Sequence, residues 1–123
     1  MANAAPYLAV VDDDASVRIA LGRLLRIAGY EVKTFESGAE FLDTWERRSP
    51  DCVVLDVHLP GLSGFDVQSV LRSHGADPPI VFITAGDDQA LTAKVRDAGG
   101  VRLLRKPFSN EALLEAVGAA LRR

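Results

Sequence analysis

Short apolar runs alternate along this chain with stretches of helical periodicity, and this alternation constrains the fold more than any other feature. Four runs span residues 8–11, 52–55, 80–83 and 101–104, and residues 31–35 read as a further strand. Runs that are apolar throughout are typical of strands buried on both faces of a parallel sheet. Between the runs, apolar residues recur at the spacing of a helix face. The pattern therefore predicts repeated strand–helix units.

The first two predicted helices have recognisable ends. The first carries its apolar face between residues 17 and 28, and Gly29 is a candidate for the position after its C-cap. Ser37 and Glu40 form the sequence pattern of a capping box. This box opens a second helix, which is predicted to run through Trp45 and to end before Pro50.

Three further helices complete the pattern: one from about residue 65 to 74, one over about 88–98, and a last one capped by Ser109. Five repeats of strand then helix predict an α/β fold, a doubly wound five-stranded parallel sheet with helices on both faces and right-handed crossovers. No linker, repeat or low-complexity stretch interrupts the chain. We therefore expect residues 1–123 to form one domain, with a core of about 7–121.

The bulk composition is that of an ordinary globular domain. Apolar residues make up 48% and charged residues 25%, and a net charge of −3 provides no bulk attraction to nucleic acid or to anionic membranes. The single cysteine, Cys52, excludes an internal disulfide and fits a reducing compartment, and we expect it to be a small buried core residue. No transmembrane or secretory segment is visible, so we expect a cytoplasmic location.

Polar residues with compatible chemistry follow the predicted strands. Asp12 and Asp13 follow the first run, Asp56 and Thr84 follow two later runs, and the last run leads to Lys106. The carboxyl ends of parallel strands meet at one edge of the sheet, where α/β folds bind ligands. The sequence therefore gathers three carboxylates, one hydroxyl and one ammonium at a single rim. This set suits a divalent cation and a phosphoryl group.

The three carboxylates favour a metal site. Clustered carboxylates repel one another, so either one of them takes a proton or a cation joins them. Ligands that are all oxygen, with several open positions, favour Mg²⁺, which keeps some of its waters and accepts phosphate oxygens. Asp14, the third acid in the row, is better explained as the N-cap of the following helix.

Asp56 is the candidate nucleophile. A carboxylate can attack phosphorus to form an acyl phosphate, and such transfer depends on positioning and on neutralisation of charge. Lys106 suits the neutralising role as a mobile point charge, and Thr84 offers one hydroxyl donor. A cis peptide bond before Pro107 is a further expectation, since X-Pro bonds adopt this form at low cost.

In combination these motifs resemble the receiver domain of two-component response regulators, over the chain from about Leu8 to Leu121. The matching segments are Val11-Asp12-Asp13-Asp14, Leu55-Asp56, Leu59-Pro60-Gly61 with Gly64, Ile83-Thr84-Ala85 and Lys106-Pro107-Phe108. The resemblance implies a flavodoxin-like (βα)5 arrangement with strand order 2-1-3-4-5. The general pattern is similar to regulators of the FixJ type, whose output domain binds DNA.

The resemblance also implies a function. Asp56 would accept a phosphoryl group from the phosphohistidine of a sensor histidine kinase, from a phosphotransfer protein, or from a small donor such as acetyl phosphate. Thr84 and Lys106 would contact the phosphoryl oxygens. The resulting change of conformation would control an output domain or a partner, with homodimerisation as one expected outcome. Such a domain is not an enzyme beyond its own phosphorylation and dephosphorylation, and it binds neither nucleic acid directly nor a membrane.

The metal ligands are implied in the same way. Asp13, Asp56 and the backbone carbonyl of His58 would bind Mg²⁺, or Mn²⁺ in its place, and Asp12 would act through water. The side chain of His58 lies either at the mouth of the pocket, where it would influence water access and the lifetime of the acyl phosphate, or in solvent as a loop residue.

One position departs from the family pattern and keeps rival readings open. Receivers usually carry Tyr or Phe three residues before the lysine, where this chain has Leu103, and leucine offers no aromatic ring to swing inward.

One alternative is therefore a receiver-like interaction module that works without phosphorylation. A small phosphatase with an aspartate nucleophile would need a second acid where His58 stands, and an FMN-binding domain would need a hydroxyl- and glycine-rich loop in place of the three aspartates.

Overall fold

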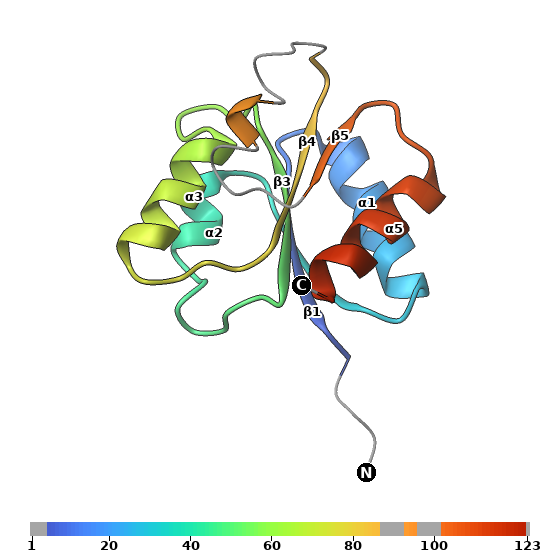
Figure 1. Ribbon diagram of the computed structural model, residues 1–123, viewed down its shortest axis with the longest axis horizontal. Helices are drawn as coiled ribbons and strands as arrows, with labels where there is room; N and C mark the ends of the chain where they lie inside the picture. Colours follow the sequence, from blue (N-terminus) through green and yellow to red (C-terminus); the bar gives the residue numbers. More distant parts are fainter. Residues whose placement is uncertain (1–4, 87–92, 96–101, 123) are drawn as a thin grey trace.

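The computed structural model describes residues 5–86, 93–95 and 102–122, and these form a five-stranded parallel sheet between two layers of helices (Figure 1). The strands lie in the order β2-β1-β3-β4-β5. Their bounds are β1 Tyr7–Val11, β2 Glu31–Phe35, β3 Cys52–Asp56, β4 Ile80–Thr84 and β5 Arg102–Arg105. The predicted doubly wound fold and its strand order are thereby confirmed.

The helices cover both faces of the sheet. Helices α1 (Ala15–Ile27) and α5 (Asn110–Leu121) lie on one face, and α2 (Gly38–Leu42) and α3 (Gly64–Ser73) lie on the other (Figure 1). Side chains alternate along each strand, so the sheet takes part in two separate cores. In β1, for example, Leu8 and Val10 pack with α1 and α5, whereas Ala9 and Val11 pack with α2 and α3.

The burial pattern explains why the central strands read as continuous apolar runs. Every residue of β1, β3 and β4 is buried, whereas the edge strands β2 and β5 include exposed positions. Each Leu or Phe that is fully buried contributes about 1.5–3 kcal/mol to folding. Cys52 lies in this layer as predicted, and burial raises the pKa of its thiol to about 12.

Side-chain caps fix the starts of the helices. Asp14 caps α1 and Ser109 caps α5, as predicted, by accepting backbone N–H groups of the first turn. Ser63 and Asp66 form a complete capping box at the start of α3. The box predicted for α2 is only half present, because the Glu40 carboxylate accepts from the N–H of Glu36 and not from that of Ser37.

The prediction for the second helix was too long. Regular helix ends at Leu42, and the chain continues through Trp45 as hydrogen-bonded turns. Trp45 stays half-buried against the core, so the apolar spacing reflects packing without helix continuity. The helix predicted over about 88–98 lies mostly outside the described residues. Only 93–95 of this range are described, and these three residues are helical. Among the described parts of the chain, no helix is long and apolar enough to cross a membrane.

Candidate functional site

The carboxyl edge of the sheet brings three acids together. Asp12 and Asp13 follow β1, and Asp56 is the last residue of β3, the neighbouring strand. One carboxylate oxygen from each of the three lies within 4.8 Å of the others. Asp12 is fully buried and Asp56 nearly so, whereas Asp13 is exposed. The predicted acidic cluster is therefore present, with one member open to solvent.

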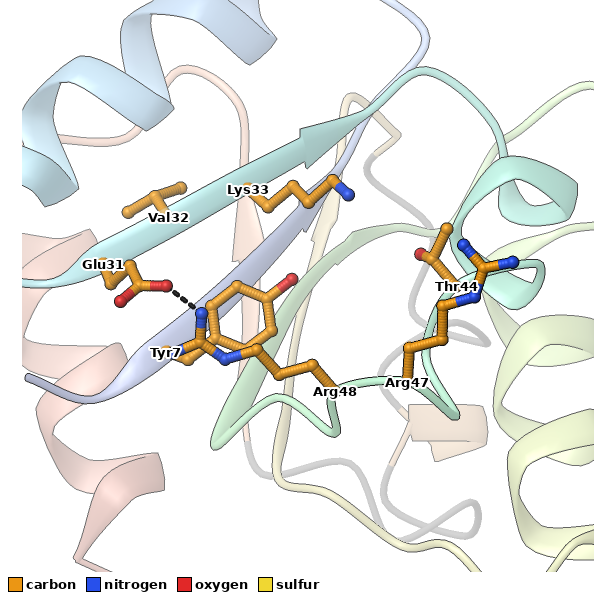
Figure 2. A pocket seen from close by; sticks show the side chains of 7 residues that line it. All are labelled: Tyr7, Glu31, Val32, Lys33, Thr44, Arg47 and Arg48. Atoms are coloured by element: carbon orange, nitrogen blue, oxygen red, sulfur yellow. Dashed lines mark hydrogen bonds and ion pairs between the residues drawn. The ribbon is translucent and has the colours of Figure 1, made fainter.

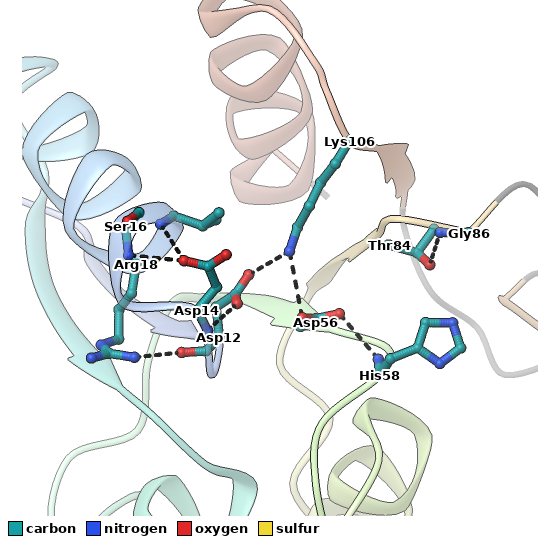
Figure 3. A network of polar contacts seen from close by, with 10 residues as sticks. Asp12, Asp14, Ser16, Arg18, Asp56, His58, Thr84, Gly86 and Lys106 are labelled. Atoms are coloured by element: carbon teal, nitrogen blue, oxygen red, sulfur yellow. Dashed lines mark hydrogen bonds and ion pairs between the residues drawn. The ribbon is translucent and has the colours of Figure 1, made fainter.

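Lys106 reaches this cluster from the end of β5, the edge strand two places away from β3 in the sheet. Its Nζ lies 2.9 Å from Oδ2 of Asp12 and 3.5 Å from Oδ2 of Asp56 (Figure 3). The lysine follows β5, and the peptide bond between it and Pro107 is cis, as predicted. The short contact to Asp12 is a salt bridge that sequence reasoning did not anticipate, because it had assigned Lys106 to a phosphoryl group and Asp12 to water.

The charges of the site shift the pKa values of its members. Burial raises the pKa of Asp56, and the carboxylates of Asp12 and Asp13 act in the same direction, whereas the His58 N–H and the Lys106 ammonium oppose the change. Burial alone would lower the pKa of Lys106, but the hydrogen bond to Asp12 and the charges of both acids outweigh it and raise the pKa. The lysine is thus held as a cation beside two anions.

Two backbone features fix the orientation of Asp56. Its Oδ1 accepts a hydrogen bond of 3.0 Å from the N–H of His58, whose side chain is exposed. Gly64 packs directly against the backbone of Asp56, since a Cβ at this glycine would lie 2.5 Å from the Asp56 carbonyl oxygen. Any larger residue at position 64 would therefore displace either α3 or the candidate nucleophile.

Thr84 ends β4 next to Asp56, and its side chain is fully buried. Its Oγ1 accepts a hydrogen bond of 3.0 Å from the N–H of Gly86 (Figure 3). A hydroxyl has one proton to donate in addition to its lone pairs, and among the described residues the Thr84 proton has no acceptor. Thr84 follows Ile83, the residue paired with Asp56, so its hydroxyl lies at the same edge of the sheet as the acid cluster (Figure 3).

Arg18 supports the loop that carries the two N-terminal acids, and sequence reasoning missed it. From α1, its guanidinium donates a hydrogen bond of 2.9 Å to the backbone carbonyl of Asp12. The N–H of Asp14 in turn donates to the Asp12 carboxylate at 2.9 Å. Arginine one helical turn after the N-cap Asp14 was the signal in the sequence, because that position faces back toward the preceding loop.

The donor set of this edge fits a hard divalent cation. All three side chains offer carboxylate oxygens, which Mg²⁺ prefers, and the backbone carbonyl of His58 follows Asp56 directly in the chain. Lys106 neutralises only part of the negative charge, because its one ammonium contacts Asp12 and Asp56 and leaves Asp13 without a paired cation among the described residues. The exposed Asp13 leaves the cluster accessible from solvent.

A doubly wound sheet in the order 2-1-3-4-5, with an acid cluster and a lysine at its carboxyl edge, defines a receiver-like signalling domain. Residues 8–118 match the family model of the response regulator receiver domain. The chain therefore belongs to this family. The family consists of signalling domains of two-component systems and is not generally classed as enzymes, and its regulators work with sensor kinases.

Curated relatives extend the comparison. The chain is 39% identical over 122 residues to the response regulator protein TodT of Pseudomonas putida, a match that covers 99% of this chain and 54% of that protein. It is 44% identical over 114 residues to nodulation protein W of Bradyrhizobium diazoefficiens, covering 93% of this chain and 50% of that protein. The chain thus spans about half the length of the curated relatives it matches.

Solved structures agree with this membership. The response regulator StyR is 44% identical, with a TM-score of 0.88, and the alignment covers 97% of this chain and 60% of that one. The BeF3-activated receiver domain of DrrB is 31% identical, with a TM-score of 0.86 and coverage of 98% and 100%. FixJ-N, a structural neighbour of the type that the sequence resembles, is 26% identical, with a TM-score of 0.90 and coverage of 98% and 97%.

Proposed function

We propose that this domain is a phosphoacceptor, in which Asp56 takes a phosphoryl group from a histidine kinase, a phosphotransfer protein or a small acyl phosphate. The observation that carries the proposal is the placement of Lys106 between Asp12 and Asp56, at the edge of a receiver fold. The transferred group would occupy the space in front of these side chains. Residues 1–123 would act as one such domain in the cytoplasm and would bind neither nucleic acid nor a membrane directly.

In the transfer step, an ionised oxygen of Asp56 forms a bond to phosphorus while the bond from phosphorus to the donor breaks. The electron pair of the broken bond stays with the donor, which is an imidazole nitrogen or an acyl oxygen. Asp56 is held for this attack by the His58 N–H and by the close contact with Gly64. Because a fixed nucleophile avoids the entropy of orientation, these contacts favour the reaction.

Lys106 and Thr84 would bind the transferred group. The ammonium of Lys106 is already within reach of Asp56, so a small displacement from Asp12 would bring it to a phosphoryl oxygen. Thr84 would donate the proton that its contact with Gly86 leaves unused. Since the phosphoryl oxygens share the negative charge of the transition state, one cation and one hydroxyl donor stabilise it directly.

Asp13, Asp56 and the His58 carbonyl would hold Mg²⁺ or Mn²⁺, with Asp12 acting through water. The bound cation would neutralise charge on the carboxylates and on the phosphoryl oxygens. Without a cation, the ionised acids repel the incoming anionic group as well as one another. The open side of Asp13 gives solvent ions access to the cluster.

The output must use an element other than an aromatic ring at position 103. Leu103 is half-buried on β5 against the core shared with α2 and α3. The contact between Thr84 and the Gly86 N–H links the site to the chain beyond β4. We infer that capture of a phosphoryl oxygen by Thr84 alters this contact and so shifts the conformation that an output domain, a partner or a second copy recognises.

Incubation with acetyl phosphate and Mg²⁺, followed by intact mass measurement, tests the proposal. The wild-type chain is expected to gain the mass of one phosphoryl group. Asp56→Asn should gain none, whereas the matched control Asp43→Asn, at an exposed acid after α2, should behave like the wild type. Absence of the mass gain in the wild type, or an equal gain in Asp56→Asn, would favour the interaction module that works without phosphorylation.

A further inference from the structure

A second pocket lies at the end of the sheet opposite to the acid cluster. It is formed by the start of β1, by β2 and by the turn that follows α2, and its cavity volume is about 350 Å³ (Figure 2). Tyr7 begins β1 and lies about 17 Å along the strand from Asp12, and Lys33 pairs with Ala9, about 10 Å along the strand from Asp12. The pocket is therefore distinct from the phosphoacceptor site. It lies beside the hydrogen-bonded turns that continue the chain after α2 ends at Leu42.

Cations dominate the lining of this pocket. Lys33, Arg47 and Arg48 face a single acid, Glu31. The Arg48 guanidinium is paired with Glu31 and lies over the ring of Tyr7, 4.1 Å from its centroid (Figure 2). Within the described part of the chain, Lys33 and Arg47 have no carboxylate partner. Lys33 contacts only an aromatic ring, that of Phe35 at 5.6 Å, so two cations without a carboxylate partner line one pocket of a protein whose net charge is −3.

Tyr7 adds a hydroxyl donor to the same pocket, on a residue that is largely buried but whose hydroxyl oxygen stays open to solvent. The residue is only 7% exposed, and among the described residues its hydroxyl has no hydrogen-bond partner. Burial raises the pKa of Tyr7, so the phenol keeps its proton at neutral pH and can donate it. The hydroxyl of Thr44 is different, because it already donates to the carbonyl of Phe41 at 3.2 Å. The pocket thus offers two cations and one unused hydroxyl proton.

We propose that this pocket binds a small organic phosphate monoester, whose phosphate group accepts hydrogen bonds from Lys33, Arg47 and Tyr7. A phosphate monoester carries a charge of about −1.5 to −2 at neutral pH, which two unpaired cations match. The planar fork of an arginine suits phosphate oxygens, and the Tyr7 hydroxyl, held by a largely buried ring, adds a directed donor. The cavity lies within the range of about 300–1,000 Å³ found for small-molecule sites, so it has room for the organic part as well.

Titration of the labelled chain in metal-free buffer, followed by amide NMR shifts, tests this proposal with AMP and inorganic phosphate as the probes. AMP is expected to cause saturable shifts around Tyr7, Lys33 and Arg47, and inorganic phosphate should compete for the same site. Lys33→Gln and Arg47→Gln should each weaken binding about tenfold, because each removes a charged hydrogen bond. Tyr7→Phe, which removes only the hydroxyl, should weaken it severalfold.

Two controls separate a built site from general charge effects. Arg23→Gln removes the same charge from an exposed position of α1 and should leave AMP binding unchanged. Asp56→Asn should also leave it unchanged, because the acceptor site lies at the other end of the sheet. Shifts that are absent, that are centred on Asp56, or that weaken equally in Arg23→Gln and Arg47→Gln would overturn the proposal.

Discussion

Replacement of Lys106 by methionine is the sharpest test of the electrostatics of the acid cluster. Methionine retains the apolar stem but removes the ammonium, so Asp12 and Asp56 lose their contacts of 2.9 and 3.5 Å. Asp12 is fully buried and cannot recover the lost interaction from water. The substitution therefore leaves uncompensated negative charge inside the protein in the absence of metal.

The size of the effect follows from this burial. Removal of one partner of a buried ion pair costs about 3–5 kcal/mol. The side chain of Lys106 is 20% exposed, so water screens part of the interaction and we expect a loss of about 2–3 kcal/mol. For a chain of this size, that loss lowers Tm by roughly 8–12 °C. Lys33→Met, at an exposed lysine without a carboxylate partner, should change stability by less than about 0.5 kcal/mol.

Urea denaturation in metal-free buffer measures this loss, with Trp45 as the single tryptophan reporter. The deficit should shrink as pH falls through the pKa of Asp56, which burial raises above its ordinary value, because protonation then removes the negative charge that has lost its cation. In the wild type, the raised pKa of Lys106 means that the charged lysine stabilises the fold at neutral pH, and this contribution is lost as pH rises through that pKa. A Lys106→Met chain as stable as the wild type at pH 7, or a deficit independent of pH, would refute the reasoning.

Three further outcomes are expected. Mg²⁺ should stabilise the wild type and so raise its Tm, with a gain of about 1.4 kcal/mol in the free energy of unfolding for each tenfold excess over the dissociation constant. Asp13→Asn should gain far less, and equal stabilisation of the two chains would exclude Asp13 as a ligand. Gly64→Ala should destabilise the fold by about 1–3 kcal/mol and slow phosphorylation, because its Cβ would meet the Asp56 carbonyl. The control Gly118→Ala in α5 should destabilise less, because its Cβ meets only the movable end of the Arg122 side chain. Equal losses of stability in urea denaturation would contradict this packing. Asp56→Asn should stabilise the metal-free protein at neutral pH, because it removes a buried negative charge. The gain should vanish as pH falls through the raised pKa of Asp56, since the protonated wild-type acid is then uncharged as well. A gain that persists at low pH would show that packing, and not charge, causes it.

The sheet and the strand-end acids could be predicted from the sequence because burial on both faces leaves a readable signal. Residues 52–55 and 80–83 are apolar throughout, and their burial in β3 and β4 gives the physical reason. Asp12 and Asp56 then had to meet, since parallel neighbouring strands end at the same edge. These predictions required local patterns, one rule of topology and the strand order that the family resemblance implied.

Other features depended on tertiary contacts that no local pattern encodes. The apolar spacing through Trp45 indicated a helix, but packing of single side chains onto the sheet satisfies the same spacing without one. The salt bridge from Lys106 to Asp12 joins residues 94 positions apart, and its atomic pairing depends on the path of β5. The close contact of Gly64 with Asp56 likewise appears only when α3 is placed against β3.

Chemical location of the phosphoryl group tests the central claim most directly. After treatment with acetyl phosphate and Mg²⁺, borohydride reduction converts an aspartyl phosphate to homoserine, which peptide mapping by mass spectrometry can place in the sequence. We predict homoserine at position 56 and at no other acid of the cluster. Homoserine at Asp12 or Asp13, or a phosphoryl group on His58 that resists reduction, would contradict the assignment of Asp56 as the acceptor.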